Sequence, residues 1–221
     1  MNYQESLLLT GDAWNYLSDE KKIEVLQTIE NHMAFEANRM SVPVEGKFLH
    51  TGSDGIVLGS YDTDARRIYI NTSQFDQNSM YGKDSSSLVT TCLHEGRHAY
   101  QHQVANGLVH HDDPNESEAW RENLRDGNYI SFRENPRGYY EQPVEVDARE
   151  FATKRYEELV NERMQAEMHQ PNSFSHAKNT FEAQFNNVKE EINCAANYQQ
   201  KQNKIELHNH NEMVETDGYH Q

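Results

Sequence analysis

The sequence predicts an α+β fold, in which a small, mostly antiparallel sheet packs against one central helix and further helices surround it. Three observations lead to this prediction. Several long segments carry apolar residues at helical spacing. Two β-rich runs lie close together in the first third of the chain, separated by four mostly polar residues. The chain has 221 residues, which is enough for one domain with a sizeable core.

The first long helix is predicted to begin after Ser18, whose hydroxyl can cap its N-terminus. Asp19 and Glu20 suit the first turn, where the helix dipole favours acidic groups. Apolar residues then recur at helical spacing: Ile23, Leu26, Ile29 and Met33. Pro43 and several glycines after it mark a change to strands and loops.

Two β-rich runs follow, GIVLGSY at 55–61 and RRIYIN at 66–71. The four residues DTDA between them suit the turn of a hairpin. A serine cluster then precedes a helix predicted at about 86–106 and supplies its N-cap, and Gly107 can end that helix in a left-handed conformation.

The second half of the chain predicts further helices. We expect loop at 110–118, with a short helix around Trp120, and a turn-rich segment at 134–143. Pro143 fits the first turn of the next helix, where its missing N–H is not needed. The apolar side of that helix is formed by Val144, Ala148, Phe151, Tyr156, Leu159 and Val160.

We expect three parts along the chain. Residues 1–170 form the main domain. Residues 171–200 form an amphipathic helix packed on it, because apolar residues recur there at helical spacing. Residues 201–221 form a polar, disordered tail, because Gln, Asn, His and Glu dominate and offer little apolar surface to bury.

The composition restricts the partners of the protein. A formal net charge of -16 repels phosphate backbones and anionic lipid, so we expect no nucleic acid and no membrane as partners. Two cysteines, Cys92 and Cys194, do not make a disulfide framework. The first residues lack the basic start and apolar stretch of a signal peptide. We therefore expect action in the cytoplasm, or delivery to a target cell without a cleavable signal.

The stretch TTCLHEGRHAYQH, residues 90–102, carries the main chemical signal. His94 and His98 are four residues apart, so on a helix both imidazoles lie on one face and can bind one metal ion. Glu95 can point at a water molecule instead of the metal. This is the H-E-x-x-H pattern of zinc hydrolases. Because 12 of the 221 residues are histidine, the pattern alone is weak.

A catalytic zinc ion usually takes three protein ligands. His102 lies two turns beyond His94, about 12 Å along the axis, which is too far to share one ion. Glu145, in the first turn of the later helix, is the better third ligand, because Ala148 and a second alanine one turn further on allow close packing of two helices. Asp147 is the reserve candidate on another side of that helix.

These pieces together, LHEGRHAYQH and YYEQPVEVDAREFA, resemble the glutamate zincins, and within them the short soluble peptidase domains of bacterial toxins, effectors and ImmA/IrrE-type regulators. The resemblance covers about residues 55–160. It implies a zincin fold, one zinc ion per chain, and an endopeptidase that acts on a specific protein or peptide substrate. Gly96, Arg97 and Arg149 are departures from the common pattern, and they leave the subgroup and the substrate open.

The resemblance also suggests where a substrate binds. RIYIN resembles the edge strand of the family, and we expect a peptide substrate to add to it as a further antiparallel strand. The alternative, an ordinary strand of the sheet, is compatible with this expectation. The substrate-binding residues expected on this basis are Ile68, Tyr69, Ile70 and Asn71.

The expected reaction is hydrolysis of a peptide bond, with Glu95 as the general base. Tyr140 is our choice for the group that stabilises the oxyanion, and Tyr139 and Arg137 are the alternatives. Two other hypotheses stay open at this point. One is a zincin-fold module that binds or senses a partner without cleaving it, and the other is a helical interaction protein without metal. The oligomeric state is not predicted.

Overall fold

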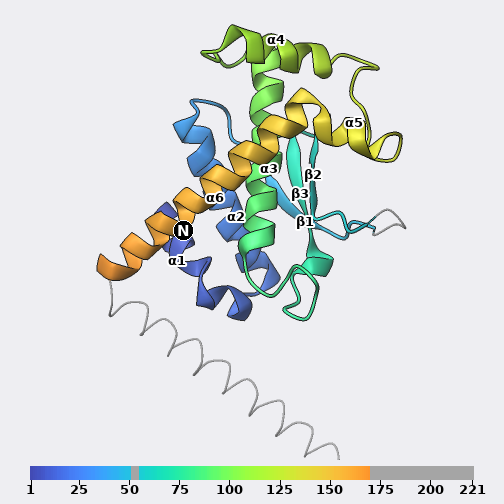
Figure 1. Ribbon diagram of the computed structural model, residues 1–221. Coiled ribbons are helices and arrows are strands. Elements are labelled where there is room, and N and C mark those ends of the chain that lie inside the picture. Colours follow the sequence, from blue (N-terminus) through green and yellow to red (C-terminus); the bar gives the residue numbers. More distant parts are fainter. Residues whose placement is uncertain (51–54, 170–221) are drawn as a thin grey trace, which may run out of the picture. The chain divides into compact units, whose positions relative to one another are not determined.

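The computed structural model describes residues 1–50 and 55–169 (Figure 1). In this part of the chain the fold is α+β, with six α-helices and a three-stranded sheet. The C-terminal helix and tail expected after residue 170 lie outside the described residues. None of the helices in the described ranges is long and apolar enough to cross a membrane.

The N-terminal part is helical. Helix α1 (Tyr3–Leu9) and a 3-10 turn (Asp12–Tyr16) precede α2 (Asp19–Glu36). The predicted cap is confirmed, because Ser18 Oγ accepts a hydrogen bond from the backbone N–H of Lys21 at 3.3 Å. The apolar positions of α2 point inward, and those that become buried include Val25, Leu26, Ile29 and Met33.

The sheet contains β1 (Val44–Lys47), β2 (Gly59–Asp62) and β3 (Arg67–Asn71), in the order β1-β3-β2. Strands β2 and β3 form the predicted antiparallel hairpin, although the first run begins to pair only at Gly59. Strand β1 pairs with β3 in parallel. The sheet is therefore mixed, and the expectation of a mostly antiparallel sheet needs this correction.

The expectation that β3 forms the edge of the sheet is wrong, since β1 and β2 pair with its two sides. Ile68 and Ile70 are fully buried. Asn71 is also buried, and its side-chain amide donates to the backbone oxygens of Leu49 and Val57. Both sides of β3 are hydrogen-bonded to other strands, so its residues, including Tyr69, cannot pair with a peptide as a further strand. The strand at the edge beside α3 is β2.

Helix α3 (Ser86–Ala105) lies at the centre of the molecule and contacts α2, α4, α6 and the sheet strands β2 and β3 (Figure 1). Its bounds agree with the prediction, but its N-terminal cap does not come from the serines. Asp84 Oδ1 accepts from the backbone N–H of Ser86 at 2.8 Å, while Ser85 Oγ donates to the backbone oxygen of Thr10. Gly107 follows the helix with φ of 69°, as predicted.

Helix α4 (Pro114–Asn123) begins inside the segment expected to be loop. Asp113 accounts for this, because its carboxylate accepts from the backbone N–H groups of Asn115 and Glu116 and so caps the helix. The short helix α5 (Pro136–Glu141) occupies the segment expected to be turns.

Helix α6 (Pro143–His169) begins at the predicted proline and crosses α3 (Figure 1). Ala148 and Ala152 are buried in the contact, as the sequence predicts. Because these side chains are small, the backbones of α3 and α6 come close together. The first turn of α6 is thereby held against the middle of α3, where the H-E-x-x-H motif lies.

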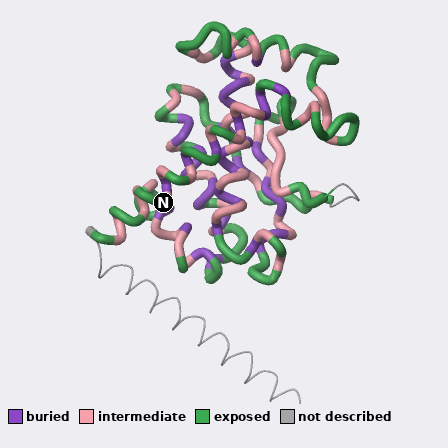
Figure 2. The backbone as a smooth tube through the Cα atoms, viewed as in Figure 1, coloured by how far each residue is buried: buried purple, intermediate pink, exposed green. Residues whose placement is uncertain are grey.

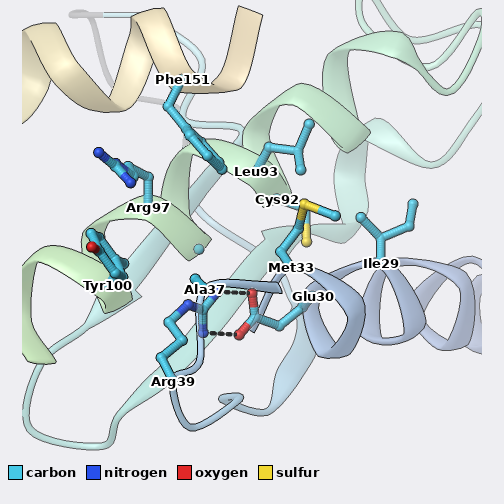
Figure 3. Close-up of a pocket in the computed structure, with 11 residues that line it drawn as sticks. Ile29, Glu30, Met33, Ala37, Arg39, Cys92, Leu93, Arg97, Tyr100 and Phe151 are labelled. Atoms are coloured by element: carbon cyan, nitrogen blue, oxygen red, sulfur yellow. Dashed lines mark hydrogen bonds and ion pairs between the residues drawn. The ribbon is translucent and has the colours of Figure 1, made fainter. Parts of the chain in front are cut away.

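The buried residues follow α2, α3, β3 and the first half of α6 through the interior (Figure 2). A buried ion pair joins α2 to the turn that follows it. Arg39 binds Glu30 through two hydrogen bonds of 2.6 and 2.7 Å, and the exposed fractions of the two side chains are 2% and 1% (Figure 3). This ion pair lies against Gly96, where an added Cβ would come within 2.8 Å of Glu30 Oε2. The glycine in the motif therefore makes room for a buried ion pair.

Candidate metal centre

His94, His98 and Glu145 come together as the sequence predicts. The helical spacing places the two imidazoles on one face of α3, and the close contact of α6 brings the carboxylate between them. His98 Nε2 lies 3.1 Å from His94 Nε2. Glu145 Oε2 lies 3.3 Å from His94 Nε2, and Glu145 Oε1 lies 3.3 Å from His98 Nε2. Within the described ranges this is a group of three side chains that could hold a metal ion.

The spacing of these atoms fits a tetrahedral ion. Ligand bonds of about 2.0–2.1 Å at tetrahedral angles place neighbouring ligand atoms roughly 3.3–3.4 Å apart. The observed separations of 3.1 to 3.3 Å are close to that value. Glu145 Oε2 is buried and has no hydrogen-bond partner among the described residues, and Arg149 Nη1 is 3.9 Å from it, beyond hydrogen-bond distance, so a metal ion at this position would satisfy the oxygen. The three residues therefore fit a metal ion.

Glu145 is well suited to be an anionic ligand. Burial works against its ionisation, but the adjacent imidazoles of His94 and His98 outweigh burial, so the pKa of Glu145 lies well below its ordinary range. The Tyr129 hydroxyl also donates to Glu145 Oε1 at 2.8 Å. The carboxylate is thus held in one orientation at neutral pH.

Glu95 lies beside this group but is not part of it. It is buried, and Oε2 accepts a hydrogen bond of 2.8 Å from the backbone N–H of Tyr61 on β2. Strand β2 approaches α3 closely here, since an added Cβ at Gly59 would lie 2.6 Å from Thr91 Cγ2. The glycine allows the strand to come near enough for its backbone to hold the carboxylate of Glu95.

A cleft opens over these residues. Two hollows, of about 380 and 600 Å³, share Gly59, Glu95, Tyr139 and Glu145 in their walls. The smaller extends along β2 to Thr63 and His102. The larger is lined by residues 55–58, by Phe132, and by further side chains from α3, α5 and α6. The cleft is therefore bordered along one side by an edge strand and is open on both sides of Glu95.

Three tyrosines lie near the site. Burial first, and then the charge of Glu145, raise the pKa values of Tyr129 and Tyr139 above the ordinary range, so both phenols stay protonated. Tyr140 is half exposed, and its ring stacks under the Arg149 guanidinium. Sequence reasoning named Tyr139 as an alternative but missed Tyr129, which lies in an irregular segment without a motif.

Two residues considered as further metal ligands from the sequence, Asp147 and His102, lie outside the group of three. Asp147 does not face the group of ligands, because both of its oxygens accept from Arg97 in hydrogen bonds of 2.8 Å. His102 is near β2, with its ring centroid 5.5 Å from that of Tyr61. Burial, and then the nearby His98, lower the pKa of His102 to about 4.

Three arginines that the sequence singled out near the site form contacts with other residues of the fold. Arg97 binds Asp147 of α6 and lies over the rings of Tyr100, Trp120 and Phe151. Arg149 donates to the backbone oxygen of Tyr140, and its Nη1 is 3.9 Å from Glu145 Oε2. Arg137 pairs with Glu141 on α5 and is largely exposed.

Comparison with protein-family models, curated proteins and solved structures finds no match to this chain.

Proposed function

We propose that this protein is a zinc-dependent endopeptidase of the glutamate-zincin type, with His94, His98 and Glu145 as the ligands. The observation that carries the proposal is the position of Glu95. A carboxylate next to three ligands, held by a backbone N–H and open to a cleft, is what a hydrolytic site needs in a general base. Two imidazoles and one carboxylate at tetrahedral spacing favour zinc over a harder ion.

When bound, zinc acts as a Lewis acid that polarises a carbonyl group and lowers the pKa of water. Glu95 takes the proton of the attacking water and passes it to the nitrogen of the leaving amine. The backbone N–H of Tyr61 keeps that carboxylate aimed at the cleft. Tyr139, as a protonated phenol near Glu145, donates a hydrogen bond to the developing oxyanion, while Tyr129 keeps its donation to Glu145 Oε1. The role of Tyr140 in stabilising the oxyanion stays a prediction, and its half-exposed position supports that role less than the position of Tyr139 does.

The substrate is proposed to be an extended peptide segment of a protein. Strand β2 is an edge of the sheet, and Gly59 borders both hollows. A peptide that pairs with β2 would pass over Glu95 and occupy a hollow on each side of the scissile bond. The role first expected for β3 thus falls to β2. Action on a target protein as a toxin or effector is part of this proposal.

The test is cleavage by zinc-loaded protein. A cell lysate is incubated with wild-type protein or with Glu95→Gln, and new N-termini are identified by mass spectrometry. Glu118→Gln, the same change at an exposed residue of α4, is the matched control.

We expect new N-termini with wild type and Glu118→Gln, and none with Glu95→Gln, although all three bind one zinc ion. Bound zinc without cleavage by wild type would favour a module that binds or senses a partner. Absence of bound zinc would remove the proposal.

A further inference from the structure

The environment of His98 contains a fully buried amide, that of Gln101. Its exposed fraction is 0%, although glutamine is a polar residue that is usually exposed. Gln101 lies one turn after His98 on α3, at the contact with α6. All of its polar atoms are engaged by three neighbours, and these neighbours decide which way the amide points.

The amide nitrogen faces two acceptors. Gln101 Nε2 donates to the backbone oxygen of Val144 at 2.9 Å and to Asp147 Oδ2 at 2.6 Å. The backbone carbonyl of Val144 has no hydrogen to donate, and both oxygens of Asp147 accept from Arg97, so the amide oxygen cannot take this position. The Oε1 atom therefore faces the other way, toward His98.

The orientation of Asp147 is itself fixed. Arg97 Nε and Nη2 each donate to one of its oxygens at 2.8 Å. The guanidinium of Arg97 lies 4.6 Å from the ring centroid of Tyr100 and 4.8 Å from that of Phe151, and Figure 3 shows these three side chains on one side of α3. An arginine placed between aromatic rings and a carboxylate has little freedom to turn.

The fixed orientation of Gln101 determines the tautomer of the His98 imidazole. His98 Nδ1 lies 2.8 Å from Gln101 Oε1, which can only accept. Nδ1 must therefore carry a hydrogen, so in the neutral imidazole the lone pair is on Nε2, which faces His94 Nε2 and Glu145 Oε1. A histidine ligand needs this tautomer and this ring orientation to bind a metal through Nε2.

We propose that Gln101 is the positioning residue that fixes His98 as a metal ligand, and that an amide is required there because it must donate to α6 and accept from His98. The inference rests on the proposed metal site. The proposal adds that the hydrogen bonds of Gln101 to Val144 and Asp147, which join α3 to α6, set the affinity of the site for zinc. A carboxylate at 101 would place an acceptor against Val144 and Asp147 and would not replace the amide.

The experiment measures the dissociation constant for zinc with a competing chelator, in wild type, Gln101→Met and Gln101→Glu. Circular dichroism first confirms that each protein is folded at the temperature used. Gln103→Met is the matched control. Gln103 is also buried on α3 and exchanges two hydrogen bonds with the backbone of Met40, away from the ligands.

We expect zinc affinity to fall about 10–100-fold in both Gln101 variants, and to stay unchanged in Gln103→Met. Wild-type affinity in Gln101→Met would overturn the inference. Tighter binding in Gln101→Glu would also overturn it, because it would mean that a carboxylate serves at least as well as the amide. A wild type that binds no zinc would instead remove the proposed function.

A second readout needs no variant. In zinc-loaded wild type, nuclear magnetic resonance should show a slowly exchanging hydrogen on Nδ1 of His98, coupled to its ring nitrogen. A hydrogen that exchanges as fast as that of an exposed histidine would show that Gln101 Oε1 does not hold it.

Discussion

The buried ion pair between Glu30 and Arg39 allows a quantitative prediction. Replacing Arg39 with Met keeps much of the side-chain volume but leaves the Glu30 carboxylate uncompensated in the interior. Glu30 would retain the hydrogen bond of 3.1 Å from the backbone N–H of Val42 and would lose both bonds of 2.6 and 2.7 Å to the guanidinium. Removal of one partner of a buried pair costs about 3–5 kcal/mol.

For a domain of this size, each kcal/mol lowers the melting temperature by about 2–4 °C, so we expect a decrease of roughly 6–20 °C. The double variant Glu30→Gln/Arg39→Met should lose less stability than Arg39→Met, because no charge is left buried. Arg121→Met is the control, since Arg121 pairs with Glu118 at the surface, and it should change little.

The assay is thermal unfolding followed by circular dichroism, at a fixed zinc concentration because bound metal also stabilises the folded state. A double variant that is less stable than Arg39→Met would refute the reasoning. It would mean that the lost packing and hydrogen bonds outweigh the uncompensated charge.

Three further predictions concern the site and a remote network. His98→Ala should lose nearly all bound zinc in equilibrium dialysis, because two ligands alone hold the ion weakly; full zinc retention would contradict the site. Tyr139→Phe should lower kcat but leave zinc content unchanged, as expected for a group that donates only to the oxyanion, and an unchanged kcat would exclude that role. Burial and the hydrogen bond of 2.9 Å to Glu162 raise the pKa of Tyr3 far above 10. Tyr3 therefore contributes stability that is present below pH 10 and lost above it, so Tyr3→Phe should flatten the decline in unfolding free energy above pH 10; equal slopes in both proteins would count against this.

The parts of the structure that could be predicted depend on local spacing. The helix with its motif, the cap at Ser18 and the proline that begins α6 follow from patterns within a few residues of one another. The ligand group joins two such patterns, since small residues near Glu145 indicate close contact with another helix. For these reasons the three candidate ligands could be brought together without any long-range information.

The parts that were missed depend on contacts between distant segments. A hairpin pattern does not say which of its strands pairs with a third one, so β1 could not be placed beside β3. Tyr129 reaches Glu145 from an irregular segment, and its neighbours give no periodic signal. Gln101 looked like an ordinary polar residue of a helix, because its partners Val144 and Asp147 lie more than 40 positions away.

The spacing of the ligands along the chain has a consequence for the integrity of the protein. His98 and Glu145 are 47 positions apart (145 minus 98), so a bound ion would close a loop that contains α4 and α5. Closing such a loop restricts the unfolded chain and stabilises the folded one. If a protease cut the exposed stretch 125–128, each fragment would keep part of the ligand group. The fragments would then be held together by the metal as well as by the contact of α3 with α6, and a chelator would weaken their association.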